Sequence, residues 1–176
     1  MTAAKQPRAD AFVAKIEKHA GILHKVARAY CSNAAERPDL VQEMMVALWR
    51  SFDRYDASRP FTTWMYRIAL NVAISFYRSE DRRTGRITEL KNVEIAAEPP
   101  PSDPRVGTLL ECIESLGVLD KALVLLYLDG YSHAEISDVL GITATNAATK
   151  LGRIKQHLRA AMTALANERE STHGTR

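Results

Sequence analysis

A polar segment in the middle of the chain separates two stretches of helical periodicity. Residues 81–108 are mixed in charge and carry a cluster of prolines between Glu98 and Pro104. They show no helical repeat of apolar residues, and such a composition is typical of a flexible linker. Each flanking stretch must therefore bury its own core, which predicts two small domains, over residues 8–80 and 109–166.

The overall composition favours an all-α protein that folds in water. Apolar residues make up 46% of the chain and charged residues 26%, with only 8 Gly and 7 Pro among 176 residues. No run reaches the roughly 18 apolar residues that a membrane helix needs. The N-terminus also lacks the apolar core of a secretory signal. We therefore expect a cytoplasmic protein without membrane insertion.

The first domain is predicted to contain three helices. Apolar residues recur near helical spacing from Phe12 to Tyr30 and predict a single helix there. Asp39, with Gln42 three residues later, indicates an N-cap and its capping-box partner at the start of a second helix. Turn-forming residues before Pro60 end that helix, and a third helix follows the proline.

The third helix is predicted to have one packing side and one binding side. On a helical wheel its large apolar residues, between Phe61 and Phe76, cluster together. Arg67, Asn71 and Arg78 fall together about a third of a turn away. We therefore expect this second group to face away from the core, on the side of the helix that binds.

The second domain carries the pattern of a helix-turn-helix. Residues 119–128 are apolar nearly all round, as expected of a buried helix. Ser132 and Glu135 predict a capping box on a short helix that Gly141 closes, and Thr143 is placed to cap the last helix. A short helix, a glycine turn and a long helix in succession indicate the helix-turn-helix motif.

The basic charge of the second domain is gathered on its last helix. Between Val139 and Asn167 the chain has four Lys or Arg residues and no Asp or Glu, whereas residues 109–138 have six acidic residues against Lys121 alone. A helix-turn-helix presents its last helix to DNA. The net charge of +3 is too small to demonstrate nucleic-acid binding, but its distribution indicates a DNA-binding helix.

Two motifs closely resemble the conserved regions of extracytoplasmic-function (ECF) sigma factors. The one that resembles region 2 consists of Asp39-Leu-Val-Gln-Glu43, Trp49, Arg59-Pro-Phe-Thr-Thr-Trp-Met-Tyr-Arg-Ile-Ala69 and Asn71. Gly130-Tyr-Ser-His-Ala-Glu-Ile-Ser-Asp-Val-Leu-Gly-Ile-Thr143 resembles region 4. The resemblance implies a sigma factor that binds the β and β′ subunits of core RNA polymerase and directs the enzyme to promoter DNA.

The resemblance assigns docking on core polymerase to the second helix of the first domain. The matching residues are Asp39, Gln42, Glu43 and Trp49. Polar and aromatic side chains on a rigid helix form the kind of surface that holds a protein partner. Taken alone, Asp39 with Gln42 indicates no more than a capped helix with an acidic end.

The resemblance assigns the minus-10 promoter element to the loop 56–60 and the third helix. The matching residues are Arg59, Thr62, Trp64, Arg67 and Asn71. An unpaired strand is read by cations that bind phosphates and by pockets or aromatic faces that take bases, with stacking worth about 1–3 kcal/mol per base. Trp64 falls on the packing side of the wheel, which favours a core position over a stacking platform.

The resemblance assigns the minus-35 element, read as duplex, to the N-terminal part of the last helix. The candidate residues are Asn146, Thr149, Lys150 and Arg153. Arg and Asn can read base edges bidentately, whereas Lys and Thr more often contact phosphates. Ala148 and Lys150 stand where Lys and Arg are more usual, and Gly117 replaces the usual Pro, so the promoter sequence is not predicted.

The sequence contains no recognisable catalytic or metal-binding motif, so we expect neither an enzyme nor a cofactor. His133-Ala-Glu135 matches the His-x-Glu of zinc deaminases, but no Pro-Cys-x-x-Cys follows. Cys31 and Cys112 lie in no CxxC motif or Cys/His cluster, and we expect both to be reduced thiols.

Two other functions remain open on the residues alone. A free-standing helix-turn-helix regulator that binds operator DNA as a dimer would explain residues 109–165 but not the motif from Asp39 to Asn71. A helical module that only binds protein would keep its activity without residues 144–165. For a sigma factor we expect a monomer when free, and a flexible linker would let an anti-sigma factor clamp both domains together.

Overall fold

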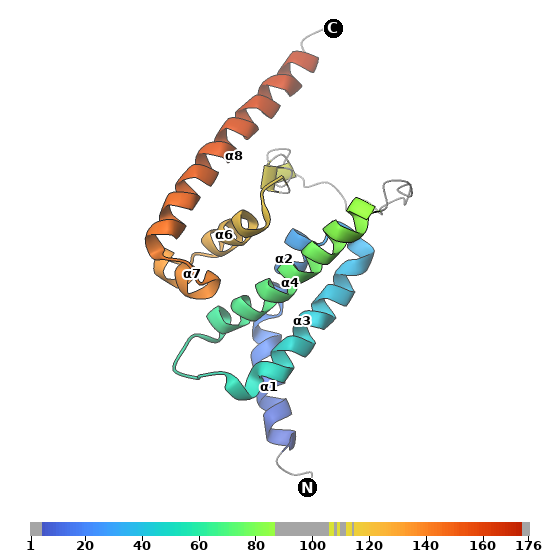
Figure 1. Cartoon of the computed structure of the whole chain (residues 1–176), viewed down its shortest axis with the longest axis vertical. Helices are drawn as coiled ribbons and strands as arrows, with labels where there is room; N and C mark the ends of the chain where they lie inside the picture. The colour runs from blue at the N-terminus through green and yellow to red at the C-terminus, as the bar shows by residue number, and fades with distance from the viewer. Residues whose placement is uncertain (1–4, 87–105, 108, 110–111, 114, 174–176) are drawn as a thin grey trace. The chain divides into compact units, whose positions relative to one another are not determined.

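The structure is a computed structural model that describes residues 5–86, 106–107, 109, 112–113 and 115–173. Every long regular element within these residues is an α-helix, which confirms the predicted all-α fold (Figure 1). The chain forms two compact units, Met1–Ala96 and Ala97–Arg176. In the described residues, no helix is both long and apolar enough to cross a membrane.

The first unit is built from four helices and two short 3₁₀ turns. They are α1 (Lys5–His19), α2 (Gly21–Tyr30), η1 (Ala34–Glu36), α3 (Arg37–Ser51), η2 (Phe52–Arg54) and α4 (Phe61–Arg86). Helices α2, α3 and α4 pack against one another. Leu40, Met44 and Leu48 recur every four residues on α3 and are fully buried, each contributing about 1.5–3 kcal/mol. Their burial fixes which side of α3 remains exposed.

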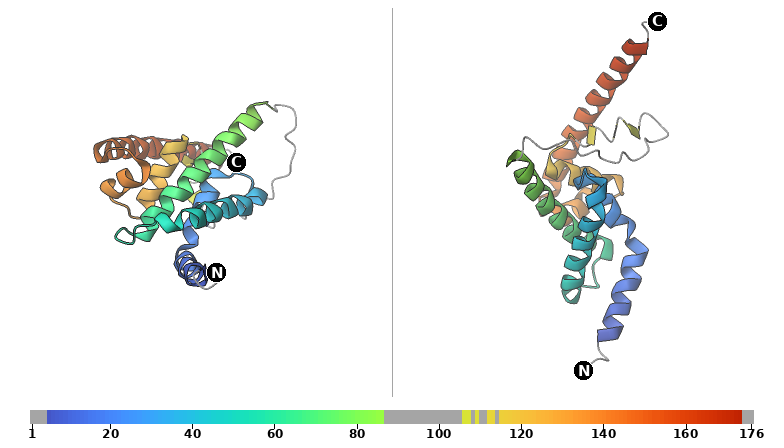
Figure 2. Two further views of the ribbon diagram at one scale, coloured as in Figure 1. Left: turned by 60° about the horizontal axis from the view of Figure 1, so that its bottom comes forward. Right: turned by 90° about the vertical axis from the view of Figure 1, so that its right-hand side faces the viewer.

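Residues 12–30, predicted as one helix, form parts of two. The break lies at Ala20 and Gly21, where the backbone N–H groups of Leu23 and His24 both donate to the Ala20 carbonyl, at 3.0 and 3.5 Å. Glycine is about 1 kcal/mol less favourable than alanine inside a helix, so little helical stability is lost by interrupting the chain here. Helix α1 diverges from α2 (Figure 2), and it contacts the C-terminal part of α3 through Arg8 and Phe12.

The predicted N-cap at Asp39 is wrong, because α3 begins two residues earlier, at Arg37. Pro38 lies in the first turn, where proline fits because its missing N–H would have no helical partner. Asp39 therefore belongs to the first turn, where its carboxylate still interacts favourably with the positive end of the helix dipole.

Two helices also run further than the sequence predicted. The linker was expected to begin at residue 81, but α4 continues to Arg86. Arginine is a good helix former, and three arginines between residues 82 and 86 offset the absence of an apolar repeat. Most of the remaining predicted linker, residues 87–105 and 108, lies outside the described residues. The second domain was predicted to end at residue 166, but α8 is helical through His173.

The second unit contains a buried helix followed by the predicted helix-turn-helix. Its described helices are α6 (Val118–Leu128), α7 (His133–Leu140) and α8 (Ala144–His173). All three pack against one another. Leu123 and Leu126 of α6, Ile136 of α7 and Leu151 of α8 are at most 1% exposed and form the centre of this core. The core holds α8 so that its opposite face remains in solvent.

Candidate nucleic-acid interface

Three of the four residues expected to bind polymerase form one exposed surface on α3. Gln42 and Glu43 lie three and four residues after Asp39, so the three residues share a face of the helix, and all three side chains are exposed. This face points away from the buried residues Met44 and Leu48. The surface is therefore acidic and accessible to a partner.

Trp49, the fourth of these residues, contacts α1 instead. Its ring lies edge-on to Phe12, with centroids 5.1 Å apart, and the Arg8 guanidinium lies 4.0 Å above it. Arg8 Nη2 also donates to the Trp49 carbonyl at 3.0 Å, and Arg8 Nε lies 2.6 Å from Asp53 Oδ1 without the alignment of a hydrogen bond. At 1.5 Å per residue, Trp49 lies about 15 Å along the helix from Asp39. It anchors α1 to α3.

The loop that precedes α4 is held by hydrogen bonds of its own. The Ser58 backbone N–H donates to Asp56 Oδ1 at 2.9 Å, and the Arg59 N–H donates to the Asp56 carbonyl at 3.1 Å. Hydrogen bonds from Ser58 lower the pKa of the Asp56 carboxyl. The Tyr55 hydroxyl donates to the Arg59 carbonyl at 2.8 Å. These bonds fix the loop backbone, so the exposed Arg59 side chain is presented from an ordered turn.

Four aromatic rings cluster around this loop. Trp64 contacts Tyr55, Phe61 and Phe52, with centroid separations of 5.2, 5.3 and 6.2 Å. Its side chain is half-buried, so the prediction of a core position is only partly right: it packs within the cluster and keeps exposed surface. A partly exposed ring next to an ordered loop that presents Arg59 is the kind of surface on which an unpaired base can stack.

Helix α1 contributes cations to these rings that were not predicted from the sequence. Lys15 Nζ lies 5.4 Å from the ring centroids of both Tyr55 and Phe61. Arg8, Phe12 and Lys15 are spaced by four and three residues, which places them on one face of α1. This spacing can be seen in the sequence. A single helix predicted over residues 12–30 nevertheless gave no reason to expect that this face lies next to the loop.

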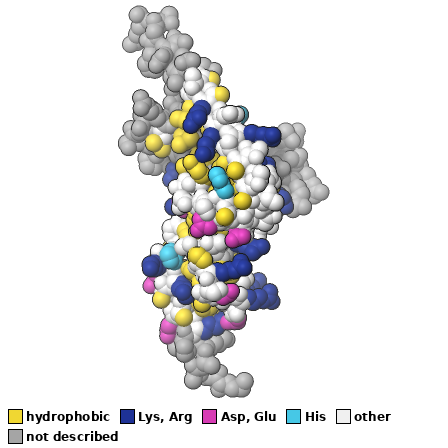
Figure 3. Space-filling view, turned by 90° about the vertical axis from the view of Figure 1, so that its left-hand side faces the viewer, with side chains coloured by type: hydrophobic (Ala, Val, Ile, Leu, Met, Phe, Trp, Pro, Cys, Tyr) yellow, Lys and Arg dark blue, Asp and Glu magenta, His cyan; other side chains and the backbone are white. Residues whose placement is uncertain are grey.

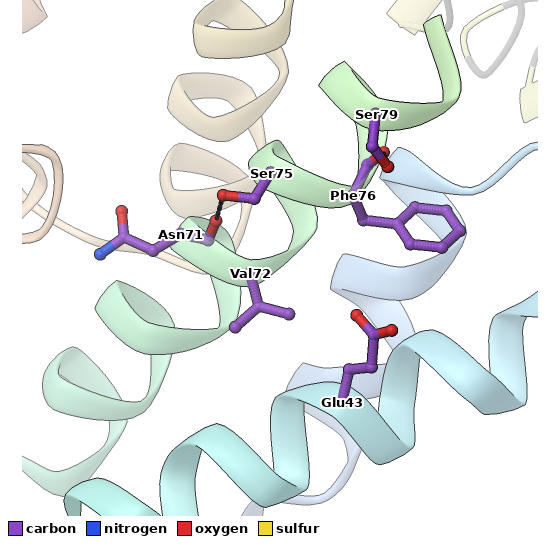
Figure 4. Close-up of a pocket in the computed structure, with 6 residues that line it drawn as sticks. All are labelled: Glu43, Asn71, Val72, Ser75, Phe76 and Ser79. Carbon is purple, nitrogen blue, oxygen red and sulfur yellow. Dashed lines mark hydrogen bonds between the residues drawn. The ribbon is translucent and has the colours of Figure 1, made fainter. Parts of the chain in front are cut away.

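Helix α4 presents an exposed polar stripe beside α3. Arg67, Asn71 and Ser75 are four residues apart and exposed, as the wheel predicted for the first two, whereas Thr62 is half-buried near the start of the helix. The Ser75 hydroxyl donates to the Asn71 carbonyl at 2.9 Å. This hydrogen bond lies within α4, and the side-chain amide of Asn71 is directed outward (Figure 4).

An open groove lies between α3 and α4. Its volume is 580 Å³, and it is lined by Glu43, Asn71, Val72, Ser75, Phe76 and Ser79. Figure 4 shows the Glu43 side chain projecting from α3 toward α4, with Val72 and Phe76 projecting from α4 toward α3. The groove therefore joins a residue expected to bind polymerase to one expected to bind the minus-10 element.

The turn of the helix-turn-helix is built as the sequence predicted. The Glu135 N–H donates to Ser132 Oγ at 3.3 Å and the Ser132 N–H donates to Glu135 Oε2 at 2.8 Å, which completes the capping box. Gly141 ends α7 with a φ of 68°, a left-handed conformation that favours glycine. Thr143 Oγ1 accepts from the Asn146 N–H at 3.1 Å and so caps α8.

The outer face of α8 carries the residues expected to bind the minus-35 element. Asn146, Thr149 and Arg153 are exposed, and Lys150 is half-buried. Ala147, Leu151, Ile154 and Leu158 are buried on the opposite face. The Thr149 hydroxyl donates to the Thr145 carbonyl at 2.9 Å. The structure thus brings all four candidates to one region of one helix.

Two lysines of α8 contact side chains of α6. Lys150 Nζ lies 3.6 Å from Asp120 Oδ1. Lys155 Nζ lies 4.0 Å from the centroid of the Tyr127 ring, and its hydrogen bond to the phenol lowers the pKa of Tyr127. On the face drawn in Figure 3, Lys and Arg side chains are interspersed with acidic ones. The positive charge of α8 is therefore confined to single side chains. The contact that each lysine makes decides whether its charge can act on a ligand.

Within the described residues, no cluster of three or more His, Cys, Asp or Glu side chains could hold a metal ion. Cys31 and Cys112 are both buried. The Cys31 thiol donates to the Asn33 carbonyl at 3.2 Å, and burial raises the pKa of this thiol. A protonated, buried thiol is a poor nucleophile.

Comparisons with known proteins agree with this geometry. Residues 16–83 match the family model described as Sigma-70 region 2, and residues 107–158 match Sigma-70, region 4. The chain is 30% identical over 169 residues to the RNA polymerase sigma factor CnrH of Cupriavidus metallidurans, covering 88% of this chain and 87% of CnrH. It is 27% identical over 164 residues to the ECF RNA polymerase sigma factor SigW of Bacillus subtilis, covering 85% and 88%.

Solved structures show the same fold. CnrH in complex with the cytosolic domain of CnrY has a TM-score of 0.65 at 23% identity, covering 92% of this chain and 95% of CnrH. The sigma factor RpoE of Bartonella quintana, in complex with the anti-sigma factor NepR, has a TM-score of 0.63 at 17% identity, covering 93% and 98%.

Two helical domains, the second with a helix-turn-helix, define a transcription factor, and the two matched regions specify which kind. The chain belongs to the ECF group of RNA polymerase sigma factors. The resemblance stated from the sequence is confirmed, and a free-standing operator-binding regulator is not favoured. The family is one of transcription initiation factors that are not enzymes.

Proposed function

We propose that this sigma factor reads the minus-35 element with Asn146, Thr149, Lys150 and Arg153 of α8. The observation that supports this assignment is the capped helix-turn-helix, which leaves the outer face of α8 exposed while Leu151 and Ile154 hold the inner face. A recognition helix enters the major groove with its N-terminal residues on base edges. Arg153 and Asn146 supply bidentate contacts, and Lys150 supplies a phosphate contact.

We further propose that Arg59, Thr62, Trp64, Arg67 and Asn71 open and read the minus-10 element. Ordering of the loop backbone by Asp56 and Tyr55 supports this role, because a fixed loop loses little conformational entropy on binding. Trp64 offers the exposed part of its ring to a base, and Arg59 and Arg67 offer charge to phosphates.

The acidic surface of α3 is the proposed docking site for core polymerase. Asp39, Gln42 and Glu43 contact the polymerase, whereas Trp49 acts indirectly by joining α1 to α3. Glu43 and Asn71 line one groove, so the docking surface and the promoter-reading surface adjoin each other in the first domain.

The test of the function is run-off transcription with core RNA polymerase from the same source and sheared genomic DNA. Sequencing of the 5′ ends should reveal discrete new starts that share two short upstream motifs. An Arg153→Ala variant should lose starts that depend on the upstream motif. Transcription without new starts, from folded protein and active core, would contradict the proposed function.

The partners of its relatives suggest how the protein is regulated. CnrH has been solved in complex with the cytosolic domain of CnrY, and RpoE in complex with the anti-sigma factor NepR. We propose that this chain is a monomer in the cytoplasm and that an anti-sigma factor holds it there until a signal releases it. Size-exclusion chromatography should give a monomer. Transcription in lysates should be higher when this anti-sigma factor is absent than when it is present. Equal transcription in both lysates would contradict the regulatory proposal.

A further inference from the structure

The DNA-facing helix of the second domain has one lysine whose charge is shared with a carboxylate of the same domain. Lys150 of α8 and Asp120, in the first turn of α6, form an ion pair at 3.6 Å. Their side chains are 39% and 35% exposed, so the pair is reached by solvent and can exchange partners. Lys150 thus has two competing acceptors, the Asp120 carboxylate and a DNA phosphate.

Lys155, the other lysine of α8 that contacts α6, has an uncharged partner, whereas the partner of Lys150 is a carboxylate. Lys155 is held by the ring and hydroxyl of Tyr127, and because this partner is neutral the positive charge of Lys155 persists. Asp120 instead cancels a charge next to the residues that read the promoter. Arg153, one turn further along α8, forms no ion pair within the described residues. Asp120 is therefore the place where α6 removes charge from the DNA-binding face.

We propose that Asp120 is a positioning residue that sets the selectivity of this sigma factor for promoter over non-promoter DNA by holding Lys150. The inference rests on the proposed role of α8 in reading the minus-35 element. Non-specific DNA affinity comes from neutralised phosphates, and each cation bound to a phosphate steepens the salt dependence. While Lys150 is paired with Asp120, it contributes little to non-specific binding. When the protein is bound at its promoter, its position on the DNA is fixed and one phosphate stays within reach of Lys150. That phosphate can displace the Asp120 carboxylate.

The test compares polymerase holoenzymes that carry the wild-type chain, Asp120→Asn, Lys150→Ala or both substitutions. Each is titrated against a short duplex of random sequence and against a promoter recovered by run-off sequencing, over a series of salt concentrations. Asp120→Asn should bind the random duplex about two- to fivefold more tightly, the range set by exposed ion pairs. The slope of log affinity against log salt should steepen by about one. Promoter affinity should rise less, so the selectivity ratio falls.

Asp138→Asn is the matched control, because it makes the same charge change in the same domain. Asp138 is an exposed carboxylate on α7 and forms no ion pair with Lys150. Asp138→Asn should leave the salt slope unchanged, and Asp120→Asn should have no effect once Lys150 is Ala. An equal effect of the two Asp→Asn changes, or a slope change that persists without Lys150, would overturn the proposal. Thermal melting confirms that each variant is folded.

An Arg153→Ala holoenzyme separates this inference from the function on which it rests. If Arg153→Ala binds the promoter as tightly as the wild type, the assignment of α8 as the minus-35 reader fails. If Arg153→Ala weakens promoter binding while Asp120→Asn behaves like Asp138→Asn, only the role of Asp120 fails.

Discussion

The two domains differ sharply in their aromatic content. All of the Phe and Trp residues, and four of the six Tyr residues, precede residue 97, whereas the rest of the chain has only Tyr127 and Tyr131. In the first domain, rings surround the loop before α4, together with Lys15 of α1. In the second domain, an aliphatic core supports a helix whose exposed face is polar.

This difference matches two states of DNA. An unpaired base exposes its π-face, which an aromatic ring can stack on. A duplex hides these faces and shows only base edges and phosphates, which polar and cationic side chains recognise. The first domain therefore has the side chains suited to an opened strand, and the second has those suited to a closed duplex.

The largest expected effect separates packing from recognition within α8. Leu151→Ala should destabilise the second domain by about 2–5 kcal/mol, because a fully buried side chain leaves a cavity. Arg153→Ala, two residues away on the exposed face, should leave the melting temperature close to that of the wild type. Denaturant unfolding measures the change in stability and thermal unfolding the change in melting temperature. Equal melting temperatures of the two variants would contradict the assignment of faces.

The next effect should separate the two domains by the DNA that each one reads. Arg153→Ala should cost about 1–3 kcal/mol on duplex containing the minus-35 element, which is the value of a bidentate base contact. It should not change binding of the holoenzyme to single-stranded minus-10 DNA. Arg67→Ala should show the reverse pattern. Fluorescence anisotropy with the two DNA probes measures the affinity of each variant. If either variant lost affinity for both probes, the assignment of one kind of DNA to each domain would be contradicted.

A smaller effect tests the attachment of α1 in the first domain. Arg8→Ala removes a cation–π contact and a hydrogen bond to the Trp49 carbonyl, and should destabilise this domain by about 1–2 kcal/mol. Arg8→Lys keeps the charge but not the planar fork, so it should recover only part of the loss. Tryptophan fluorescence during urea unfolding reports on this domain alone, since both Trp residues lie in it. An unchanged midpoint would show that α1 is held by Phe12 without Arg8.

The smallest effect is the acid sensitivity of the capping box in the second domain. Hydrogen bonds from Ser132 lower the pKa of Glu135 below its usual 4.5. The carboxylate therefore stabilises the folded state above the unfolded pKa, and this contribution is lost as the pH falls through the lower, folded value. Glu135→Gln can still accept the backbone N–H but does not titrate, so its stability should change less over this range. Identical pH profiles for the two proteins, followed by circular dichroism, would exclude this contribution.

The second domain could be predicted closely because its signals are local. Ser132, Glu135, Gly141 and Thr143 each act on backbone groups within a few residues, so the sequence alone indicates where α7 and α8 begin and end. The exposed face of α8 also follows from the spacing of its apolar residues. The Asp120–Lys150 pair was not predictable, because it depends on how α6 packs against α8.

The first domain was predicted less well because its contacts are distant in sequence. Arg8 and the Trp49 carbonyl are 41 residues apart, and nothing near either residue indicates that they meet. The capping prediction at Asp39 failed because Arg37 and Pro38 already begin the helix. Asp39, Gln42 and Glu43 share an exposed face of α3, a feature that follows from helical spacing alone.

The hydrogen bond from Thr149 to the Thr145 carbonyl limits what this side chain can offer to DNA. A threonine hydroxyl has a single proton, and here that proton is directed into the helix. Thr149 can then serve only as an acceptor or as an apolar surface, so it complements the amino group of adenine or cytosine, or the methyl group of thymine. Phosphate oxygens and guanine acceptors would require this proton, so the base nearest Thr149 should be one that presents an amino or methyl group in the major groove.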